Sequence, residues 1–214
     1  MPLIVRILPD EPAIDREFTY LIPDRLIDAL GGLSVELGTI VRVPLKGRKV
    51  RGWVTGIGVD PPSGVELQSV TKISGIGPPG SVLALAEWAS MRWAGNRPKF
   101  LRTATADRIV SFVPSSMANR PEIAALDSLS VEAFRRKKAV VRMGPNSDDW
   151  PLISTAASFG SALILTPTVA QAKTVLLKLK RAGFDAALAQ RDWEKSAAGN
   201  VTVGARAAAW APIP

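Results

Sequence analysis

One stretch decides how the first half of the chain folds: Val41-Arg42-Val43-Pro44-Leu45-Lys46-Gly47-Arg48-Lys49-Val50-Arg51-Gly52-Trp53-Val54-Thr55-Gly56-Ile57-Gly58. Apolar residues alternate with Arg42 and Pro44 over 41–45, and this period of two predicts a β-strand. Residues 46–49 then predict a tight turn in which Gly47 is free to adopt a positive φ. The apolar, Val- and Trp-containing residues 50–57 predict the returning strand of a hairpin.

The hairpin stretch carries only positive charge. Its five basic residues are Arg42, Lys46, Arg48, Lys49 and Arg51, and it has no acidic residue. Cations at the tip and along one face would suit the phosphates of a nucleic acid, because Lys and Arg displace the counterions condensed there. The alternative is a solvent-exposed turn without a partner, which is a common place for a run of charges.

Composition excludes several classes of function. The chain has 214 residues, 47% hydrophobic and 21% charged, which allows one large domain or two small ones. It contains no cysteine and no histidine, which excludes a Cys/His zinc site, disulfides and catalysis by either residue type within this sequence. No run of 18 apolar residues and no signal peptide is present, so we expect no membrane partner and a cytoplasmic location.

The net charge of +8 is unevenly distributed along the chain. The cations of the N-terminal part gather at 42–51, whereas most of its acidic residues precede residue 37. A stripe of one sign favours a polyanionic partner.

Residues 1–106 predict a small β domain closed by one or two helices. Strands are expected at 3–8, 15–23, 41–45, 50–57 and 67–76, joined by Gly- and Pro-rich turns, which indicates a small barrel or a curled sheet. A helix over 80–94 follows, with Ser81 as its N-cap and an apolar face of Val82, Leu85, Ala86, Ala89 and Trp93. A second helix is expected over 98–105.

Residues 107–138 predict a linker. Pro114, Ser115, Ser116, Asn119 and Pro121 are typical of loops, and a helix is expected from Leu129. The run Arg135-Arg136-Lys137-Lys138 either contacts DNA or is the solvated end of that helix, where cations complement the helix dipole.

Residues 139–214 alternate strand and helix. Strands are expected at 139–143, 162–166, 186–189 and 201–203, with helices at 152–159 and 169–182, and this order predicts a parallel sheet. The elements are too few to cover both faces of such a sheet, so we expect either a fragment of a longer chain or a domain that needs a partner.

The loop after the strand expected at 139–143 lies where a phosphate-binding loop would lie, but its chemistry is wrong. It reads Gly144-Pro145-Asn146-Ser147-Asp148-Asp149-Trp150-Pro151, with one glycine and no lysine. The two aspartates would repel a nucleotide, and the two prolines remove backbone donors. We therefore interpret residues 144–150 as a degenerate nucleotide loop.

Several segments together resemble the PriA family of primosomal replication-restart helicases. They are Phe18-Thr19-Tyr20-Leu21-Ile22-Pro23, Gly38-Thr39-Ile40-Val41-Arg42-Val43-Pro44, Gly52-Trp53-Val54-Thr55-Gly56-Ile57, Leu163-Ile164-Leu165-Thr166-Pro167-Thr168 and residues 201–212. Their order and spacing agree with the family over nearly the whole chain. The resemblance implies an α+β multi-domain fold: a β-barrel-like 3′-DNA-binding domain at 1–106, then a partial, degenerate RecA-like lobe at 139–214.

The resemblance also implies a pocket for the free 3′ end of a nascent DNA strand. Phe18 and Tyr20 match two aromatic residues of that pocket, while Thr19 replaces an aspartate that would bind the 3′ hydroxyl. The turn Lys46-Gly47 occupies the place of the family's Pro-Phe-Gly turn, and Gln68 takes the place of a lysine. Phe18 and Tyr20 could instead be core residues, since aromatic side chains serve both uses.

Other family features are missing from this sequence. The linker at 107–138 leaves no room for the family's winged-helix domain, and the zinc-binding and Walker B segments would follow Pro214. We therefore expect neither the zinc nor the ATP and magnesium that the family uses, and no catalytic residue. The predicted partners are fork DNA with a 3′ end, other primosome proteins and single-stranded DNA-binding protein.

The resulting hypothesis is a replication-restart protein that recognises stalled or abandoned forks and recruits primosome components without helicase activity. Two alternatives stay open: a fragment of an ATP-dependent 3′–5′ DNA helicase, and a β-barrel module that binds RNA.

Overall fold

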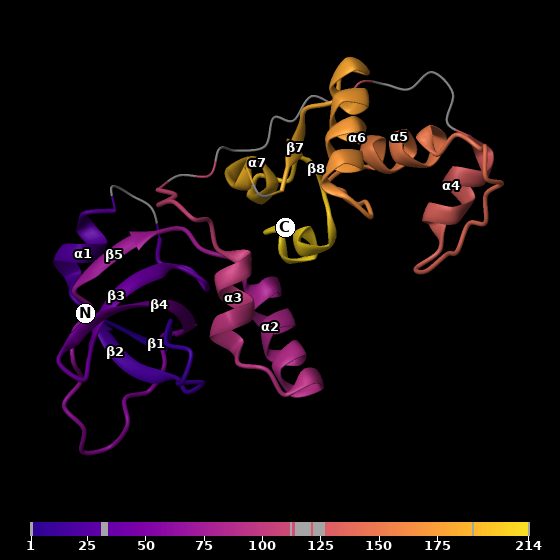
Figure 1. Ribbon diagram of the computed structural model, residues 1–214. Helices are drawn as coiled ribbons and strands as arrows, with labels where there is room; N and C mark the ends of the chain where they lie inside the picture. The colour runs from indigo at the N-terminus through magenta and orange to yellow at the C-terminus, as the bar shows by residue number, and fades with distance from the viewer. Residues whose placement is uncertain are drawn as a thin grey trace. The chain divides into compact units, whose positions relative to one another are not determined.

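A computed structural model describes residues 2–30, 34–111, 113, 121, 127–189 and 191–213 of the chain. The chain divides into two compact units, Met1–Val113 and Pro114–Pro214, here called unit 1 and unit 2 (Figure 1). Residues 112, 114–120 and 122–126 of the predicted linker lie outside the described residues.

Unit 1 is built on a five-stranded antiparallel sheet. Its strands are β1 (Leu3–Pro9), β2 (Phe18–Ile22), β3 (Ile40–Leu45), β4 (Arg48–Ile57) and β5 (Lys72–Gly75), in the order β2-β1-β4-β3-β5. A short helix, α1 (Asp24–Asp28), follows β2. The hairpin predicted from residues 41–58 is confirmed as β3 and β4, which pair in antiparallel register along the whole of β3.

The sheet does not close into a barrel, so the barrel-like prediction is wrong in this respect. In the part of the chain that the structure describes, β2 and β5 are the two edge strands of the sheet. They do not pair with each other, and only the residues just before β5 form backbone hydrogen bonds with β2. The Leu21 amide donates to the Gln68 carbonyl at 3.0 Å, and the Val70 amide donates to the Leu21 carbonyl at 2.8 Å. Residues 68–70 therefore bond to β2, and the strand expected over 67–76 is reduced to four residues beside β3.

One face of the sheet encloses the core of unit 1. Alternate residues point inward from each strand and form a single apolar cluster, with Val5, Ile7, Tyr20, Ile22, Val41, Val43, Val50, Val54 and Val70 buried. Because side chains alternate along a strand, Arg42, Lys49 and Arg51 lie on the opposite face.

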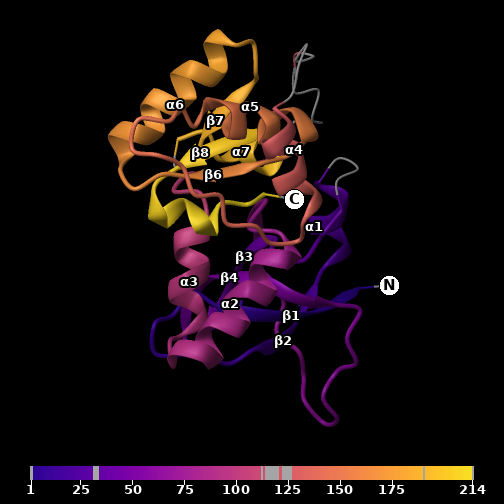
Figure 2. The same ribbon diagram turned by 90° about the vertical axis from the view of Figure 1, so that its right-hand side faces the viewer.

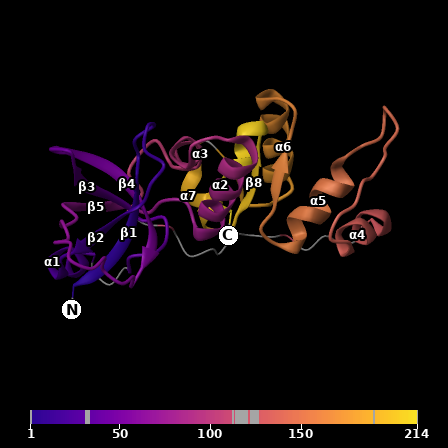
Figure 3. The same cartoon turned by 90° about the horizontal axis from the view of Figure 1, so that it is seen from below.

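Two helices lie side by side against unit 1's sheet (Figures 1 and 3): α2 (Gly80–Trp93) and α3 (Arg97–Ala104). Trp53 is fully buried, and its indole Nε1 donates to the Thr105 hydroxyl at 2.9 Å, just beyond α3. The helix prediction is confirmed, but Pro79, not Ser81, is the N-cap. Leu85 and Trp93, which were expected on the packing face, are exposed.

Unit 2 contains a three-stranded parallel sheet, as predicted. Its strands are β6 (Leu163–Leu165), β7 (Ala186–Leu188) and β8 (Val201–Gly204), in the order β6-β8-β7 (Figure 2). The helices are α4 (Ser128–Arg135), α5 (Trp150–Phe159), α6 (Val169–Arg181) and α7 (Trp193–Ala197), and a 3₁₀ helix, η1 (Arg206–Trp210), follows β8.

The strand expected at 139–143 is not formed. These residues have no regular structure, and the side chain of Val140 is 90% exposed. Strands of a parallel sheet are normally covered on both faces, so an exposed valine is incompatible with such a strand. The prediction failed because a short apolar run does not reveal whether a neighbouring strand is available to pair with it.

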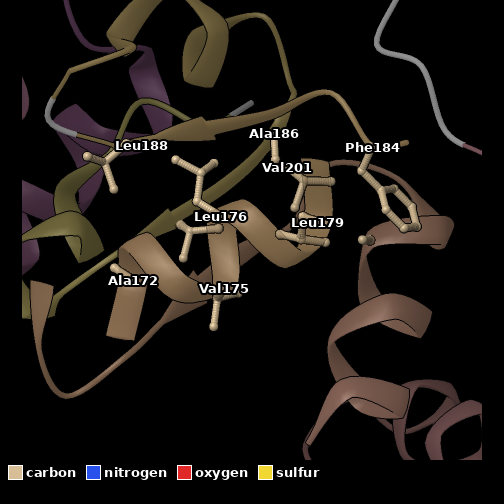
Figure 4. Close-up of a cluster of buried hydrophobic side chains, with 10 residues drawn as sticks. Ala172, Val175, Leu176, Leu179, Phe184, Ala186, Leu188 and Val201 are labelled. Carbon is tan, nitrogen blue, oxygen red and sulfur yellow. The ribbon is translucent and has the colours of Figure 1, made fainter. Parts of the chain in front are cut away.

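The core of unit 2 lies between α6 and the sheet (Figure 4). Ala172, Val175, Leu176 and Leu179 follow helical spacing and are buried in one cluster with Ala186, Leu188 and Val201 of the strands and with Phe184. This spacing is the reason that the helix was predictable from the sequence. Thr168 caps its N-terminus by accepting a bond from the Gln171 amide at 3.2 Å, and Gly183, at φ +89°, follows its C-terminal end.

Candidate nucleic-acid interface

The turn between β3 and β4 has only two residues. Lys46 and Gly47 both have positive φ, at +48° and +77°, which is the conformation of a type I′ hairpin turn. Arg48 pairs with Leu45 and Lys49 with Pro44, so both cations belong to β4 and not to a four-residue turn as expected. The basic side chains are therefore spread along the strands, with Lys46 at the tip.

Three cations lie in a row across neighbouring strands. Arg42 of β3 is directly opposite Arg51 of β4 on one side and Lys72 of β5 on the other. Ile73, the next residue of β5, packs on the core, which places Lys72 on the same outer face as Arg42. Like charges directly opposite each other destabilise a sheet. A bound anion would offset this repulsion.

Two shallow depressions meet along this row. One, of about 350 Å³, is lined by Asp10, Glu11, Arg42, Arg48, Lys49, Val50 and Arg51. The other, of about 380 Å³, is lined by Arg42, Lys49, Thr71 and Lys72. Arg42 and Lys49 line both, so the two depressions adjoin. We call the surface formed by Arg42, Lys49, Arg51, Thr71 and Lys72 the basic face.

Part of the positive charge is neutralised within unit 1. Asp10, whose side chain is almost completely buried, accepts from Arg51 at 2.6 Å and from Arg102 of α3 at 2.6 Å. Arg48 lies 3.9 Å from Glu11. Some of the acidic residues that precede residue 37 in the sequence therefore lie close in space to cations of the hairpin.

The remaining cations are available to a ligand. Among the residues that the structure describes, Arg42, Lys46, Lys49 and Lys72 are exposed and form no ion pair. Arg51 is held over the Trp53 ring, with its guanidinium carbon 5.6 Å from the ring centroid. The basic face therefore has a fixed arginine at one end and unpaired cations along the rest.

The aromatic residues of the predicted 3′-end pocket lie on the inner side of β2. Tyr20 is 4% exposed, and its hydroxyl donates to the Pro44 carbonyl at 2.9 Å. Burial raises the pKa of the Tyr20 phenol above its ordinary value. Phe18 is half-buried against the same core, with the Arg16 guanidinium 5.5 Å from its ring centroid. In this structure Tyr20 packs as a core residue and its ring has no exposed face.

The other two predicted pocket residues lie nearby at the same edge of the sheet. Thr19 is half-buried on the face opposite Tyr20, paired with Arg6 of β1. Gln68 is exposed, and its carbonyl accepts the bond from Leu21 described above. The structure thus brings Gln68 beside β2, and Tyr20 beside the strand that ends in the Lys46-Gly47 turn. Contact of these residues with DNA stays a prediction.

A comparison with protein families identifies unit 1. Residues 6–106 match the family model of the PriA 3′DNA-binding domain. Unit 1 is a PriA 3′DNA-binding domain. A search of curated proteins gave no match for the chain. The family assignment makes unit 1 a DNA-binding module that acts at 3′ ends in replication restart, and its match spans β2, the basic face, α2 and α3.

Sequence reasoning missed two residues of the 3′DNA-binding domain that shape the basic face. Lys72 joins Arg42 only through the pairing of β5 with β3, thirty positions earlier in the chain. Asp10 reaches Arg51 and Arg102 through a loop after β1. A single lysine in a short strand and a single aspartate in a loop carry no local signal, and only the tertiary structure could have revealed their contacts.

The predicted nucleotide loop of unit 2 is an exposed turn. Ser147 donates its amide to the Gly144 carbonyl at 3.0 Å, and Asp148 accepts from the Trp150 amide at 3.0 Å at the start of α5. Asp148 also lies 4.0 Å from Lys178. Because residues 139–143 form no strand, the strand–loop–helix arrangement of a phosphate-binding loop is not present here.

Elsewhere in unit 2, the basic residues that the structure describes are less clustered than on the basic face of unit 1. In the basic run at 135–138, Arg135 and Arg136 lie 3.9 Å and 3.3 Å from Glu132, one helical turn earlier.

None of the described helices combines the length and the apolar character that a membrane span requires.

Proposed function

We propose that this chain recognises the 3′ end of a DNA strand at a stalled or abandoned replication fork and helps to restart replication in the cytoplasm without unwinding DNA itself. By family resemblance, its further role is to recruit other primosome proteins and single-stranded DNA-binding protein. The observation that carries the proposal is the family match over residues 6–106.

The basic face supports this proposal. Arg42, Lys49 and Lys72 are exposed and unpaired across three strands, at distances that a sugar–phosphate chain can follow from strand to strand. Phosphate contacts of this kind position a protein on DNA without reading sequence. A fork-recognition protein requires that property, because forks stall at any sequence.

The chemistry of unit 2 favours a protein that does not hydrolyse a nucleotide. By their place in the sequence, Asp148 and Asp149 correspond to the part of a nucleotide loop where phosphate charge would lie, and no lysine is present between Gly144 and Pro151. Transfer of a phosphoryl group depends on cations that neutralise the developing negative charge, and these acids would oppose it.

The test is a titration of the full chain with labelled forks that differ only at the nascent 3′ end. Forks with a 3′ hydroxyl, a 3′ phosphate or a blunt end are compared by fluorescence anisotropy. The proposal predicts tightest binding to the 3′ hydroxyl fork. Equal affinity for all three would overturn 3′-end recognition, and equal affinity for structured RNA would favour an RNA-binding module. ATP hydrolysis stimulated by the fork would overturn the absence of a motor.

The basic face is tested by the salt dependence of the same binding. Replacing Arg42, Lys49 and Lys72 by alanine should lower the slope of log K against log salt by about 0.7–0.9 for each phosphate that the variant no longer neutralises. A matched control replaces Lys173, Lys180 and Arg181, three exposed cations of α6, and should leave the slope unchanged. An unchanged slope in the first variant would mean that the basic face is solvated in the complex.

A further inference from the structure

The Asp10 carboxylate holds two arginines that come from different layers of unit 1. Arg51 of β4 donates from Nε and Nη2 to Oδ2 of Asp10, at 2.8 Å and 2.6 Å. Arg102, in the last turn of α3, donates from the same two groups to Oδ1, at 3.0 Å and 2.6 Å. Each carboxylate oxygen therefore serves one guanidinium, and Asp10 fixes the two arginines next to each other.

This cluster of Asp10, Arg51 and Arg102 keeps a positive charge. One carboxylate balances only one of the two guanidiniums, because arginine stays protonated in proteins. Arg97 of the same helix shows the opposite arrangement. Its side chain is 18% exposed and donates to two carboxylates, those of Asp15 and Glu17, at 2.6 Å and 2.7 Å. The Asp10 cluster therefore has one positive charge left for an anion, whereas the charge of Arg97 is fully balanced.

Both arginines of the cluster also have unused donors. They bind Asp10 through Nε and Nη2, and neither Nη1 group donates to a residue that the structure describes. The side chains of Arg51 and Arg102 are 30% and 48% exposed, so a ligand can reach them. The Trp53 ring restrains Arg51 further. Two neighbouring guanidiniums with free N–H groups and a fixed orientation suit a phosphate, whose oxygens accept several charge-assisted bonds.

The cluster continues the row of cations on the basic face. Arg51 is directly opposite Arg42 in the register of β3 and β4, and Arg42 is opposite Lys72. Arg102 of α3 lies beside Arg51, because Asp10 joins the two. The cations therefore follow one another from β5 across β3 and β4 to α3. An anion whose charges repeat along its length, such as DNA, matches this row better than a single small anion does.

We propose that Arg51 and Arg102, positioned by Asp10, bind one backbone phosphate of DNA and extend the DNA path from the sheet onto α3. The inference deepens the proposed function and rests on it, because it assigns a further contact with the same DNA. Asp10 is a positioning residue, which holds the two guanidiniums so that one phosphate accepts from both. The alternative is a structural Arg102 that balances Asp10 and complements the dipole at the end of α3.

The experiment replaces single backbone phosphates of a labelled fork, one at a time, by an uncharged methylphosphonate, and includes a fork without its 5′-terminal phosphates. Binding of the full chain is measured by fluorescence anisotropy. With the parent chain, replacement of the phosphate bound by Arg51 and Arg102 should weaken binding about tenfold.

Arg102→Gln should weaken binding of the unmodified fork about fivefold and reduce the penalty at that one phosphate. It should also lower the salt slope by about 0.7–0.9, because Arg51 and Asp10 then neutralise each other and one phosphate loses its cation. Arg181→Gln is the matched control, since it removes an exposed arginine from the last turn of α6. The affinity, the slope and the scan should stay unchanged in this control.

Asp10→Asn tests the positioning role. This variant gains one positive charge, so a carboxylate that merely opposed DNA would give stronger binding and an undiminished penalty at the scanned phosphate. Loss of positioning should instead reduce the penalty at that phosphate and leave the others unchanged. Thermal unfolding is measured for both variants, and Arg102→Gln, at a half-exposed residue, should stay within a few degrees of the parent.

The outcomes separate a failed inference from a failed function. An unchanged slope and scan in Arg102→Gln would overturn the inference, and the proposed function would stand if replacement of Arg42, Lys49 and Lys72 still lowers the slope. A penalty that arises only on removal of a 5′-terminal phosphate would place a strand end in the site and overturn the backbone assignment. If the parent chain binds no fork, the proposed function itself fails.

Discussion

The two units use their sheets in opposite ways. In unit 1 the antiparallel strands β3 and β4 alternate buried valines with exposed cations, so one face of the sheet is core and part of the other meets solvent. In unit 2 every residue of β7 and β8 is buried. Antiparallel sheets commonly leave one face wet, whereas parallel sheets are covered on both faces.

This difference determines where each unit can present a binding surface. Unit 1 presents cations directly from its strands, in positions fixed by the hydrogen-bonded register of β3, β4 and β5. Unit 2 presents its described polar groups from loops and helices, such as Asp148 before α5 and Lys173 on α6, and not from the buried strands β7 and β8. Hydrogen bonds between β3, β4 and β5 therefore hold the backbone of the basic face in place, and the positions of its cations depend on the packing of the unit 1 core.

The largest effect is expected from Trp53→Ala. The Trp53 side chain is fully buried and donates to the Thr105 hydroxyl, and its removal should cost about 3–5 kcal/mol of unit 1 stability. Because the basic face is carried by the same strands, fork binding should fall in parallel. Denaturant unfolding followed by circular dichroism, together with anisotropy of labelled fork DNA, measures both effects.

Leu179→Ala is the matched change in unit 2. Leu179 is fully buried between α6 and the sheet, and its truncation should cost about 2–5 kcal/mol. The two units are expected to unfold separately, so this variant should keep fork binding at concentrations of denaturant that leave unit 1 folded. Loss of DNA binding in both variants would show that unit 1 depends on unit 2 for its stability.

A smaller, pH-dependent effect is expected from Asp192→Ala in unit 2. The Asp192 carboxylate is partly buried, which on its own would raise its pKa. Bonds from Arg191 and from the Leu188 amide at 3.0 Å outweigh this and lower the pKa below its ordinary value. Removing the carboxylate should cost about 1 kcal/mol at neutral pH. Because the pKa of Asp192 is lower in the folded state, its ionised carboxylate stabilises unit 2 above about pH 4. This stabilisation is lost as the pH falls through the folded-state pKa.

The stability difference between parent and Asp192→Ala should therefore shrink between about pH 5 and about pH 2, as measured by thermal unfolding in low-salt buffers. Asp192→Asn is the control, because its amide oxygen can still accept from Leu188 but does not titrate. A difference that is constant over this range would mean that the charge of Asp192 contributes nothing to unit 2.

The smallest effect is expected from Lys46→Asn at the hairpin turn of unit 1. Lys46 has φ +48°, a conformation in which Asn is favoured over Lys, and Asn-Gly is a preferred pair for this turn. Lys46→Asn should raise the stability of unit 1 by about 0.5 kcal/mol. Gly47→Ala, at φ +77°, should lower it by about 1 kcal/mol, and a thermal scan detects both. A stabilising Gly47→Ala would contradict the type I′ turn.

Local patterns predicted the elements that depend on neighbouring residues. The alternation of Val41, Arg42 and Val43 predicted β3, and the helical spacing of Ala172, Val175 and Leu179 predicted α6. Predictions that depended on a distant partner did worse. The strand expected at 139–143 found no strand to pair with, and the strand expected at 67–76 divided its bonds between β2 and β3.

The candidate site shows the same division. Arg42, Lys49 and Arg51 were identified from a run of charge, but Lys72 and Asp10 were not, because Lys72 reaches the basic face through the pairing of β5 with β3 and Asp10 through an ion pair from the loop after β1. Phe18 and Tyr20 were identified as aromatic residues of a 3′-end pocket or of the core, and the structure places Tyr20 in the core.

By itself, the sequence determined the sign of the charge, the period of most strands and helices, and the lack of cysteine, of histidine and of a lysine between Gly144 and Pro151, because these are properties of composition and of residues close along the chain. The tertiary structure alone decided which cations keep their charge free for a ligand and which are neutralised by Asp10 and Glu11. It also decided which aromatic rings are buried and which meet solvent. Pairing across a sheet and burial against a helix are contacts between residues far apart in sequence, and no local pattern encodes them.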